Sequence, residues 1–168
     1  MYYDLFLEMK KMLGQVGTWL DKAEAYAKER NFDSNAYLTF RLAPDQLAFA
    51  RQIQIACDTA KLGASRLTGK EAPSHADTEQ TLDELRLRLK SVISYLDGFS
   101  AKDFEGAATR SVTQPRWEGK VMTGKDYFIE HVQPNFYFHA SHTYAILRHN
   151  GVPVGKKDYL GALSQRLP

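Results

Sequence analysis

Apolar residues recur at steps of three and four positions along the N-terminal part of the chain, a spacing typical of an amphipathic helix. The pattern predicts a helix from about Tyr2 to about Lys28, with Leu13 and Trp19 beside its apolar stripe. A polar run over residues 30–35 ends this helix. The stripe itself comprises Leu5, Met9, Met12, Val16, Leu20, Ala23 and Ala27.

Two further apolar stripes predict a second and a third helix. The second begins near Pro44, because proline suits the first helical position, and it ends at Gly69 as a C-cap. The third begins at a capping box formed by Thr81 and Glu84 and ends at Gly98. Many residues on the buried side of the second helix are small, so a neighbouring helix can approach closely. That side comprises Leu47, Ala50, Ile53, Ala56, Cys57, Ala60, Ala64 and Leu67.

The segment 111–122 changes character, since glycine, proline and β-branched residues there favour a small hairpin or an extended loop. A fourth helix then begins with a capping pattern at Thr123 and runs to about Asn150. Pro134 lies inside it and is expected to kink it. Four amphipathic helices of these lengths predict an all-α fold, a four-helix bundle with the hairpin or loop before the last helix.

Composition narrows the class of protein. The length of 168 residues suggests a single domain spanning 1–168. A net charge of +2, with no basic stripe, argues against a nucleic-acid partner. The chain has no apolar run long enough for a membrane span, no signal peptide pattern and a single cysteine, Cys57, so a cytoplasmic location is expected.

Polar residues interrupt the stripe that heptad spacing predicts for the buried face of the fourth helix. A buried polar group without a partner costs about 1–3 kcal/mol, so these residues need one another, a second helix, water, a ligand or a metal. Gln54, on the second helix, is placed to reach the same region. The predicted stripe comprises Phe128, Val132, Asn135, His139, His142 and Ile146. A central ligand pocket is therefore predicted from Gln54, Asn135, His139 and His142, and a metal site from His139 and His142.

Structural roles for the same residues remain open. His139 is equally suited to a core histidine bonded to a carbonyl or to Gln54, and His142 to packing at the core boundary. Asn135 is suited to satisfying the backbone groups that Pro134 frees. The aromatic run 136–138 is suited to core packing, to a pocket wall or to a homodimer contact.

Several segments resemble one family of bacterial proteins. Pro134-Asn135-Phe136-Tyr137-Phe138-His139 and the segment 145–153 (AILRHNGVP) are similar to the domain-of-unknown-function family DUF1993, as are 19–23, 41–45 and 50–58. The resemblance covers nearly the whole chain. It implies a branch of the DinB/YfiT-like superfamily, and hence a four-helix bundle with a long crossover connection.

The resemblance also implies a site. Many superfamily members bind a divalent metal through three histidines, and some are thiol-dependent transferases or isomerases. In the matching positions, His139 is the second histidine of the pair on the last helix and Asn135 replaces the first. Gln54, or alternatively Gln52, replaces the histidine of the second helix, and His142 falls where the superfamily often has glutamine.

Three hypotheses of function follow from these observations. The leading one is a module that binds a small-molecule ligand at a degenerate metal site. The second is a metal-dependent transferase or isomerase, with Zn²⁺, Ni²⁺, Mn²⁺ or Fe²⁺ as the cofactor. The third is a structural or interaction protein that forms a homodimer and uses the polar network to fix the register of its helices.

Overall fold

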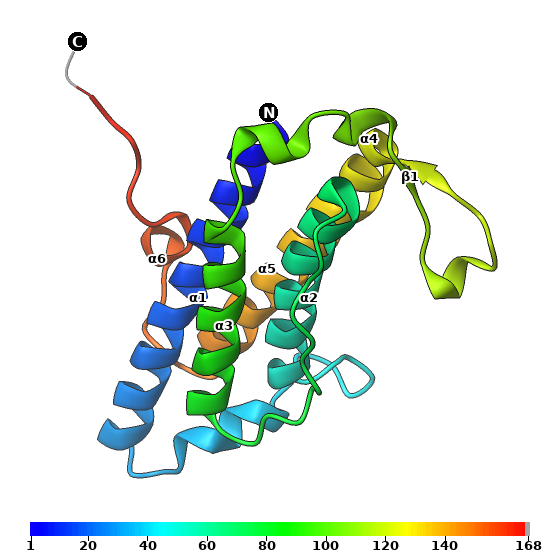
Figure 1. The fold of residues 1–168 in the computed structure, drawn as a ribbon. Helices are drawn as coiled ribbons and strands as arrows, with labels where there is room; N and C mark the ends of the chain where they lie inside the picture. The colour runs from blue at the N-terminus through cyan, green and yellow to red at the C-terminus, as the bar shows by residue number, and fades with distance from the viewer. Residues whose placement is uncertain (167–168) are drawn as a thin grey trace.

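The computed structural model describes residues 1–166, and long helices make up most of it (Figure 1). The last two residues of the predicted domain 1–168 lie outside the described part. The long helices are α1 (Tyr2–Glu29), α2 (Phe49–Thr68), α3 (Leu82–Asp97) and α5 (Gln133–His149). Shorter helical elements are η1 (Ser34–Thr39), η2 (Ala101–Phe104), η3 (Ala107–Thr109), η4 (Pro115–Trp117), α4 (Gly124–Tyr127), the π-helical turn η5 (Phe128–Val132) and α6 (Lys156–Leu160).

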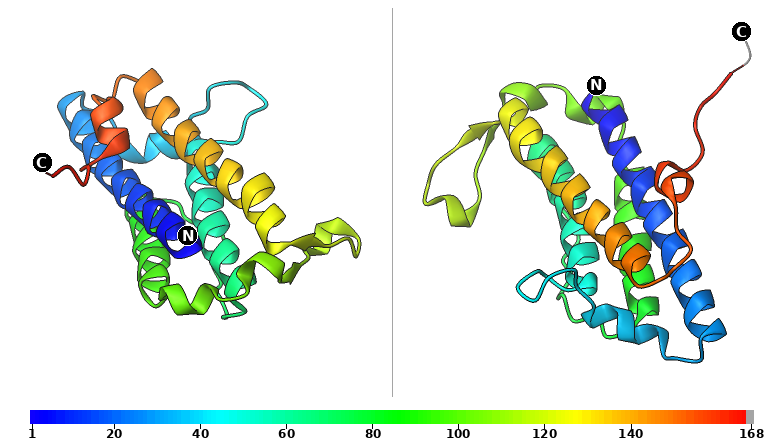
Figure 2. Two further views of the ribbon diagram at one scale, coloured as in Figure 1. Left: turned by 90° about the horizontal axis from the view of Figure 1, so that it is seen from above. Right: turned by 180° about the vertical axis from the view of Figure 1, so that it is seen from behind.

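The long helices form a ring in which α1 and α2 each pack against both α3 and α5 (Figures 1 and 2). Helices α2 and α3 run in the same direction, because the chain returns along α2 through residues 69–81 before α3 begins. At one end Leu82 N donates to Asn35 Oδ1 (3.0 Å), and at the other Lys70 Nζ donates to Gly98 O (3.4 Å). The predicted four-helix bundle with a long crossover connection is confirmed.

The apolar stripe of α1 lies in the core as its spacing predicts. Met9, Val16, Leu20 and the other stripe residues from Met9 onward are buried, Leu5 is half-buried, and Trp19 is fully buried. Helix α6 covers this side of α1, where Trp19 Nε1 donates to Asp158 O (3.1 Å).

The start of the second helix differs from the prediction. Helix α2 begins at Phe49, and Pro44 lies in an irregular loop that Phe49 N closes by donating to Phe40 O (2.8 Å). Leu47 belongs to this loop and is 47% exposed, so it is not part of the buried side of α2. The predicted C-cap is confirmed, since Gly69 has a φ of +82°, a conformation that glycine adopts without strain.

The hairpin predicted before the last helix is confirmed as a two-stranded antiparallel pair. Strand β1 (Ser111–Val112) pairs with β2 (Met122–Thr123), and the loop between them carries η4. Gly124 joins β2 to α4 at a close approach, because a Cβ at this position would meet the carbonyl oxygen of Ala107. Glycine is therefore required where the hairpin enters the last helix.

The last helix is continuous from α4 to α5 but contains the π-helical turn η5 immediately before Gln133 and Pro134. Proline has no N–H to donate, and a π turn adds one residue to the turn that precedes it. The added residue shifts the buried face by one position: Phe136 and Thr143 are fully buried, whereas Asn135 and His142 are half-buried at its edge. The heptad stripe predicted from sequence is therefore wrong at Asn135 and His142 and right at His139.

No helix in the described residues 1–166 is both long enough and apolar enough to cross a bilayer.

Candidate functional site

His139 lies at the interface of α2 and α5, where its ring meets Gln52. His139 Nδ1 and Gln52 Oε1 are 2.7 Å apart, and the two residues are 6% and 1% exposed. Gln52 Nε2 donates to Leu47 O (2.8 Å), which directs the amide oxygen toward the ring. Because that oxygen only accepts, the proton of His139 lies on Nδ1 and Nε2 is an acceptor. Burial, with smaller effects of the charges of His142 and Arg51, lowers the pKa of His139 to about 4, so the ring is neutral at pH 7.

Asn135 makes the second polar contact between α5 and α2, one turn closer to the hairpin. Asn135 Nδ2 donates to Thr59 Oγ1 (2.7 Å), and Thr59 Oγ1 donates to Ile55 O (2.7 Å). Asn135 therefore binds the neighbouring helix, not the backbone groups around Pro134. The two contacts form a polar seam along the α2–α5 interface.

His142 does not join His139 at a common site. Its Nδ1 donates to Phe138 O (2.7 Å) one turn earlier in α5, and its ring lies 4.0 Å from the ring of Phe138. Phe138 is 53% exposed, whereas Phe136 is fully buried. The homodimer contact that the aromatic run suggested stays a prediction.

Gln54 also lies away from His139. Residues two positions apart in a helix point about 200° apart, so Gln52 and Gln54 cannot face the same neighbouring helix. Gln54 Oε1 accepts from Arg51 Nη1 (3.0 Å), and Gln54 Nε2 donates to Glu79 Oε2 (2.8 Å). The residue of α2 that meets His139 is therefore Gln52, the alternative in the sequence comparison.

Gln54 belongs to a buried charge cluster that holds the connection 69–81 against α2 and α3. Arg88, 2% exposed, lies 2.7 Å from Asp58, 2.6 Å from Asp77 and 2.8 Å from Glu79. Lys61, 3% exposed, pairs with Asp58 at 2.9 Å. Burial alone would raise the pKa of Glu79, but hydrogen bonds, first of all from Arg88, hold it below its ordinary value. Arg51 also pairs with Asp77, so three positive charges face three carboxylates and the cluster is best explained as structural.

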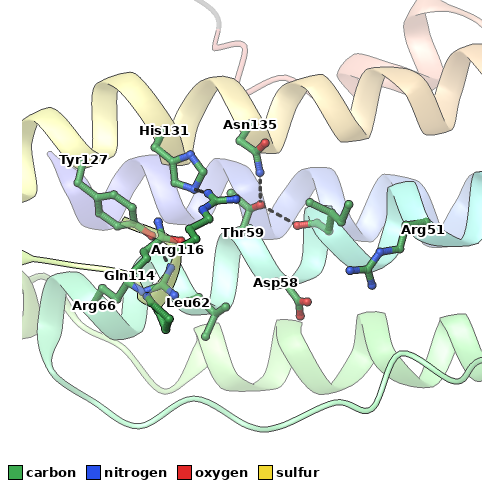
Figure 3. A pocket seen from close by; sticks show the side chains of 12 residues that line it. Arg51, Asp58, Thr59, Leu62, Arg66, Gln114, Arg116, Tyr127, His131 and Asn135 are labelled. Carbon is green, nitrogen blue, oxygen red and sulfur yellow. Dashed lines mark hydrogen bonds between the residues drawn. The ribbon is translucent and has the colours of Figure 1, made fainter. Parts of the chain in front are cut away.

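A cleft of about 370 Å³ opens beside the polar seam, between α2, the β1–β2 hairpin and the last helix (Figure 3). We call it the α2–α5 cleft. Thr59 and Asn135 form its floor beside the seam, and the hairpin contributes Gln114, Pro115 and Arg116. The remaining lining residues are Arg51, Ile55, Asp58, Leu62, Arg66, Tyr127 and His131.

Two arginines reach the wall of the cleft that the last helix forms. Arg66 Nη1 donates to Tyr127 Oη (2.9 Å), and Arg116 Nη2 donates to His131 Nε2 (3.1 Å). Burial first, and then the charges of Arg116 and Arg66, lower the pKa of His131. His131 is therefore neutral at pH 7, which leaves Nε2 able to accept from Arg116.

The cleft continues into a shallower groove that includes His139. His131 and Asn135 line both hollows, so the polar seam forms their shared edge. The groove is lined by Glu130, His131, Pro134, Asn135, Phe138 and His139. Of the residues predicted for a ligand pocket, the structure brings together Asn135 and His139, and it places His142 and Gln54 elsewhere.

The donors around His139 do not fit a divalent transition metal. Such sites use three or four histidine, cysteine or carboxylate ligands, and no group of three such residues is placed to hold a metal ion within residues 1–166. The side chains nearest His139 along the seam are the neutral Gln52, Thr59 and Asn135. His142, the predicted second ligand, is turned to Phe138 O.

Sequence reasoning missed most of the cleft. Arg66 and Arg116 are separated by 50 positions, and nothing in the sequence distinguishes them from other charged surface residues. Gln114 lies in a segment predicted only as a hairpin or loop. Thr59 could have indicated the cleft from sequence, because it is a polar residue on the small-residue side of α2.

Comparison with known proteins places the chain in a family. The model of the family described as domain of unknown function DUF1993 matches residues 1–160. A solved structure described as a DinB family member protein from Shewanella denitrificans is 54% identical, with a TM-score of 0.97 over 100% of this chain and 96% of that chain. Comparison with curated proteins finds no match. The chain therefore belongs to the DUF1993 family and has the fold of a DinB family protein.

Proposed function

We propose that this protein binds a small polar molecule in the α2–α5 cleft. The observation that carries the proposal is the cleft itself, a hollow of about 370 Å³ with hydrogen-bonding side chains from three separate elements. Ligand pockets for small molecules have volumes of about 300–1,000 Å³ and combine apolar walls with a few converging polar groups.

The polar seam supplies the floor of the proposed site. Asn135 Nδ2 and Thr59 Oγ1 are already engaged with each other, which fixes their orientation before a ligand arrives. Two acceptors remain for a ligand in the cleft and the groove: the amide oxygen of Asn135 and the Nε2 lone pair of His139. A neutral, pre-oriented floor suits recognition of a polar molecule without a large reorganisation.

The donor set around His139 favours such binding over a metal-dependent transferase or isomerase. His139 is the one strong metal ligand at the seam in the described residues, and its Nδ1 already has Gln52 Oε1 as a hydrogen-bond partner. A structural role of the seam explains the two satisfied contacts but not the open cleft beside them.

The proposal is tested by screening small polar metabolites for binding by thermal shift, with hits followed by ¹H–¹⁵N NMR titration. Asn135→Ala is expected to weaken a hit by about tenfold, the loss typical of one or two hydrogen bonds. Gln133→Ala is the matched control, because Gln133 lies on the same helix and is exposed. Hits that bind both variants equally, or the absence of any hit, would contradict the proposal.

A further inference from the structure

We propose that the occupant of the α2–α5 cleft carries an anionic group, a carboxylate or a phosphate, which Arg66 and Arg116 bind together. This inference rests on the proposed function and names the chemical class of the ligand. It is carried by the placement of the two guanidinium groups and by the lack of a carboxylate partner for either of them in the described residues.

The two guanidinium groups are directed to the same wall of the cleft. Arg66 bonds Tyr127 and Arg116 bonds His131, and these partners lie four positions apart, one turn of the same helix. The ring centroids of Tyr127 and His131 are 5.5 Å apart. Figure 3 shows Arg66 and Arg116 gathered beside these rings, with Arg51 at the far end of the cleft. Both cations therefore lie near one position in the cleft.

Neither arginine has a carboxylate to balance its charge. Within residues 1–166, no acidic side chain lies within 4.0 Å of Arg66 or Arg116. Asp58, the acidic residue that lines the cleft, is paired with Arg88 and Lys61. Two cations at the same wall of the cleft without a carboxylate partner repel each other, and a bound anion would offset that repulsion.

The remaining donors of these residues suit an oxyanion. A guanidinium has five N–H donors, and each arginine uses one of them on the last helix. The others match the paired oxygens of a carboxylate or a phosphate, which arginine binds in a bidentate manner. The contact with Tyr127 orders the half-buried Arg66, so less freedom is lost on binding there than at Arg116, which is exposed.

Gln114 adds an independent sign of a missing ligand. It lies on the hairpin wall of the cleft and is 7% exposed, and its Nε2 has no hydrogen-bond partner in the described residues. A buried amide donor without a partner is unfavourable. An oxyanion in the cleft offers the acceptor that this donor lacks after a small adjustment of the hairpin.

The test uses matched pairs of probes that differ in charge: succinate with succinamide, and glycerol 3-phosphate with glycerol. Each is titrated into ¹⁵N-labelled protein at constant ionic strength, and the amide signals of Thr59, Tyr127 and Asn135 are followed. We expect at least one anion to bind at these signals and its neutral partner to bind more weakly by about tenfold or more. Succinate and glycerol 3-phosphate then distinguish a carboxylate from a phosphate.

Variants locate the charge that matters. Arg66→Gln and Arg116→Gln are each expected to weaken the anion by about 10- to 100-fold, as loss of a charge-assisted hydrogen bond does. Lys120→Gln is the control, because it removes one positive charge from the same hairpin at an exposed position outside the cleft. Circular dichroism establishes that each variant is folded.

Three results would overturn the inference. Equal affinity for the anionic and neutral probes of a pair would show that the cleft binds a ligand without recognising its charge. The proposed function would then still hold. Equal weakening by Lys120→Gln and Arg116→Gln would show non-specific attraction. No binding by any probe or by any screened metabolite would remove both the inference and the proposed function.

Discussion

The buried ring of His139 should make the stability of the protein depend on pH in a predictable way. Its pKa is about 4 in the folded protein, against 6.5 for an exposed histidine, because burial disfavours the charged ring. The unfolded chain therefore binds a proton between about pH 6.5 and pH 4 that the folded protein does not. This contribution to stability is fully present above pH 6.5 and is lost as the pH falls through that window.

The two pKa values give the size of the effect. Integrating the linkage relation from pH 7 down to about pH 4.5 gives a loss of about 2.5 kcal/mol in the free energy of unfolding from His139 alone. The His139→Asn variant keeps an N–H donor for Gln52 Oε1 but cannot titrate, so it should lack this loss. The difference in pH dependence between wild type and variant isolates His139 from the other titrating groups.

Urea unfolding of both proteins at several pH values, followed by circular dichroism, measures this difference. An NMR titration of the His139 ring in the wild type checks the pKa directly. Parallel curves of unfolding free energy against pH for the two proteins would refute the reasoning, since they would mean that His139 titrates alike in the folded and unfolded states.

The other predictions concern the charge cluster, the glycines and metal binding. Arg88→Met should lower the free energy of unfolding by about 3–5 kcal/mol because it leaves buried carboxylates unpaired, while Lys90→Met on the exposed side of α3 should change it little, as urea unfolding would reveal. Gly124→Ala should cost about 1–3 kcal/mol because its Cβ meets a backbone carbonyl, whereas Gly14→Ala, with open space around it, should stabilise by about 0.5–1 kcal/mol; thermal unfolding distinguishes the two. Protein incubated with Zn²⁺, Ni²⁺, Mn²⁺ or Fe²⁺ and desalted should retain well under one ion per chain by mass spectrometry; about one ion, lost in His139→Ala, would contradict our account of the donors.

Most of the fold follows from patterns that the sequence states locally. The stripe of α1, the capping box at Thr81 and the stop at Gly69 each depend on neighbours within a few positions, and the structure confirms all three. The predicted helix start at Pro44 was wrong because Pro44 lies in a loop, which Phe49 closes through its hydrogen bond to Phe40. That contact is not visible in helical periodicity.

The site was predicted only in part, because a shift of one residue in the last helix changes which side chains face the core. A regular helix through Pro134 would have placed Asn135 and His142 in the core, but the π turn before it shifts the face. His139 stays buried because it lies at a boundary that both registers share. The choice of Gln54 over Gln52 failed for a similar reason, since two positions along α2 separate opposite sides of the helix.

The cleft required the tertiary structure. The hairpin brings Gln114 and Arg116 across to Arg66, and neither hairpin residue carries a motif. Only the spatial arrangement reveals two arginines without acidic partners in the described residues.

A crystal structure of the protein with the tightest-binding anion from the screen tests the central claim most directly. We predict that the ligand lies in the α2–α5 cleft, with its anionic oxygens within hydrogen-bonding distance of Arg66 and Arg116 and its body against Asn135 and Thr59. A ligand bound at another surface, with the cleft filled only by solvent, would contradict the account.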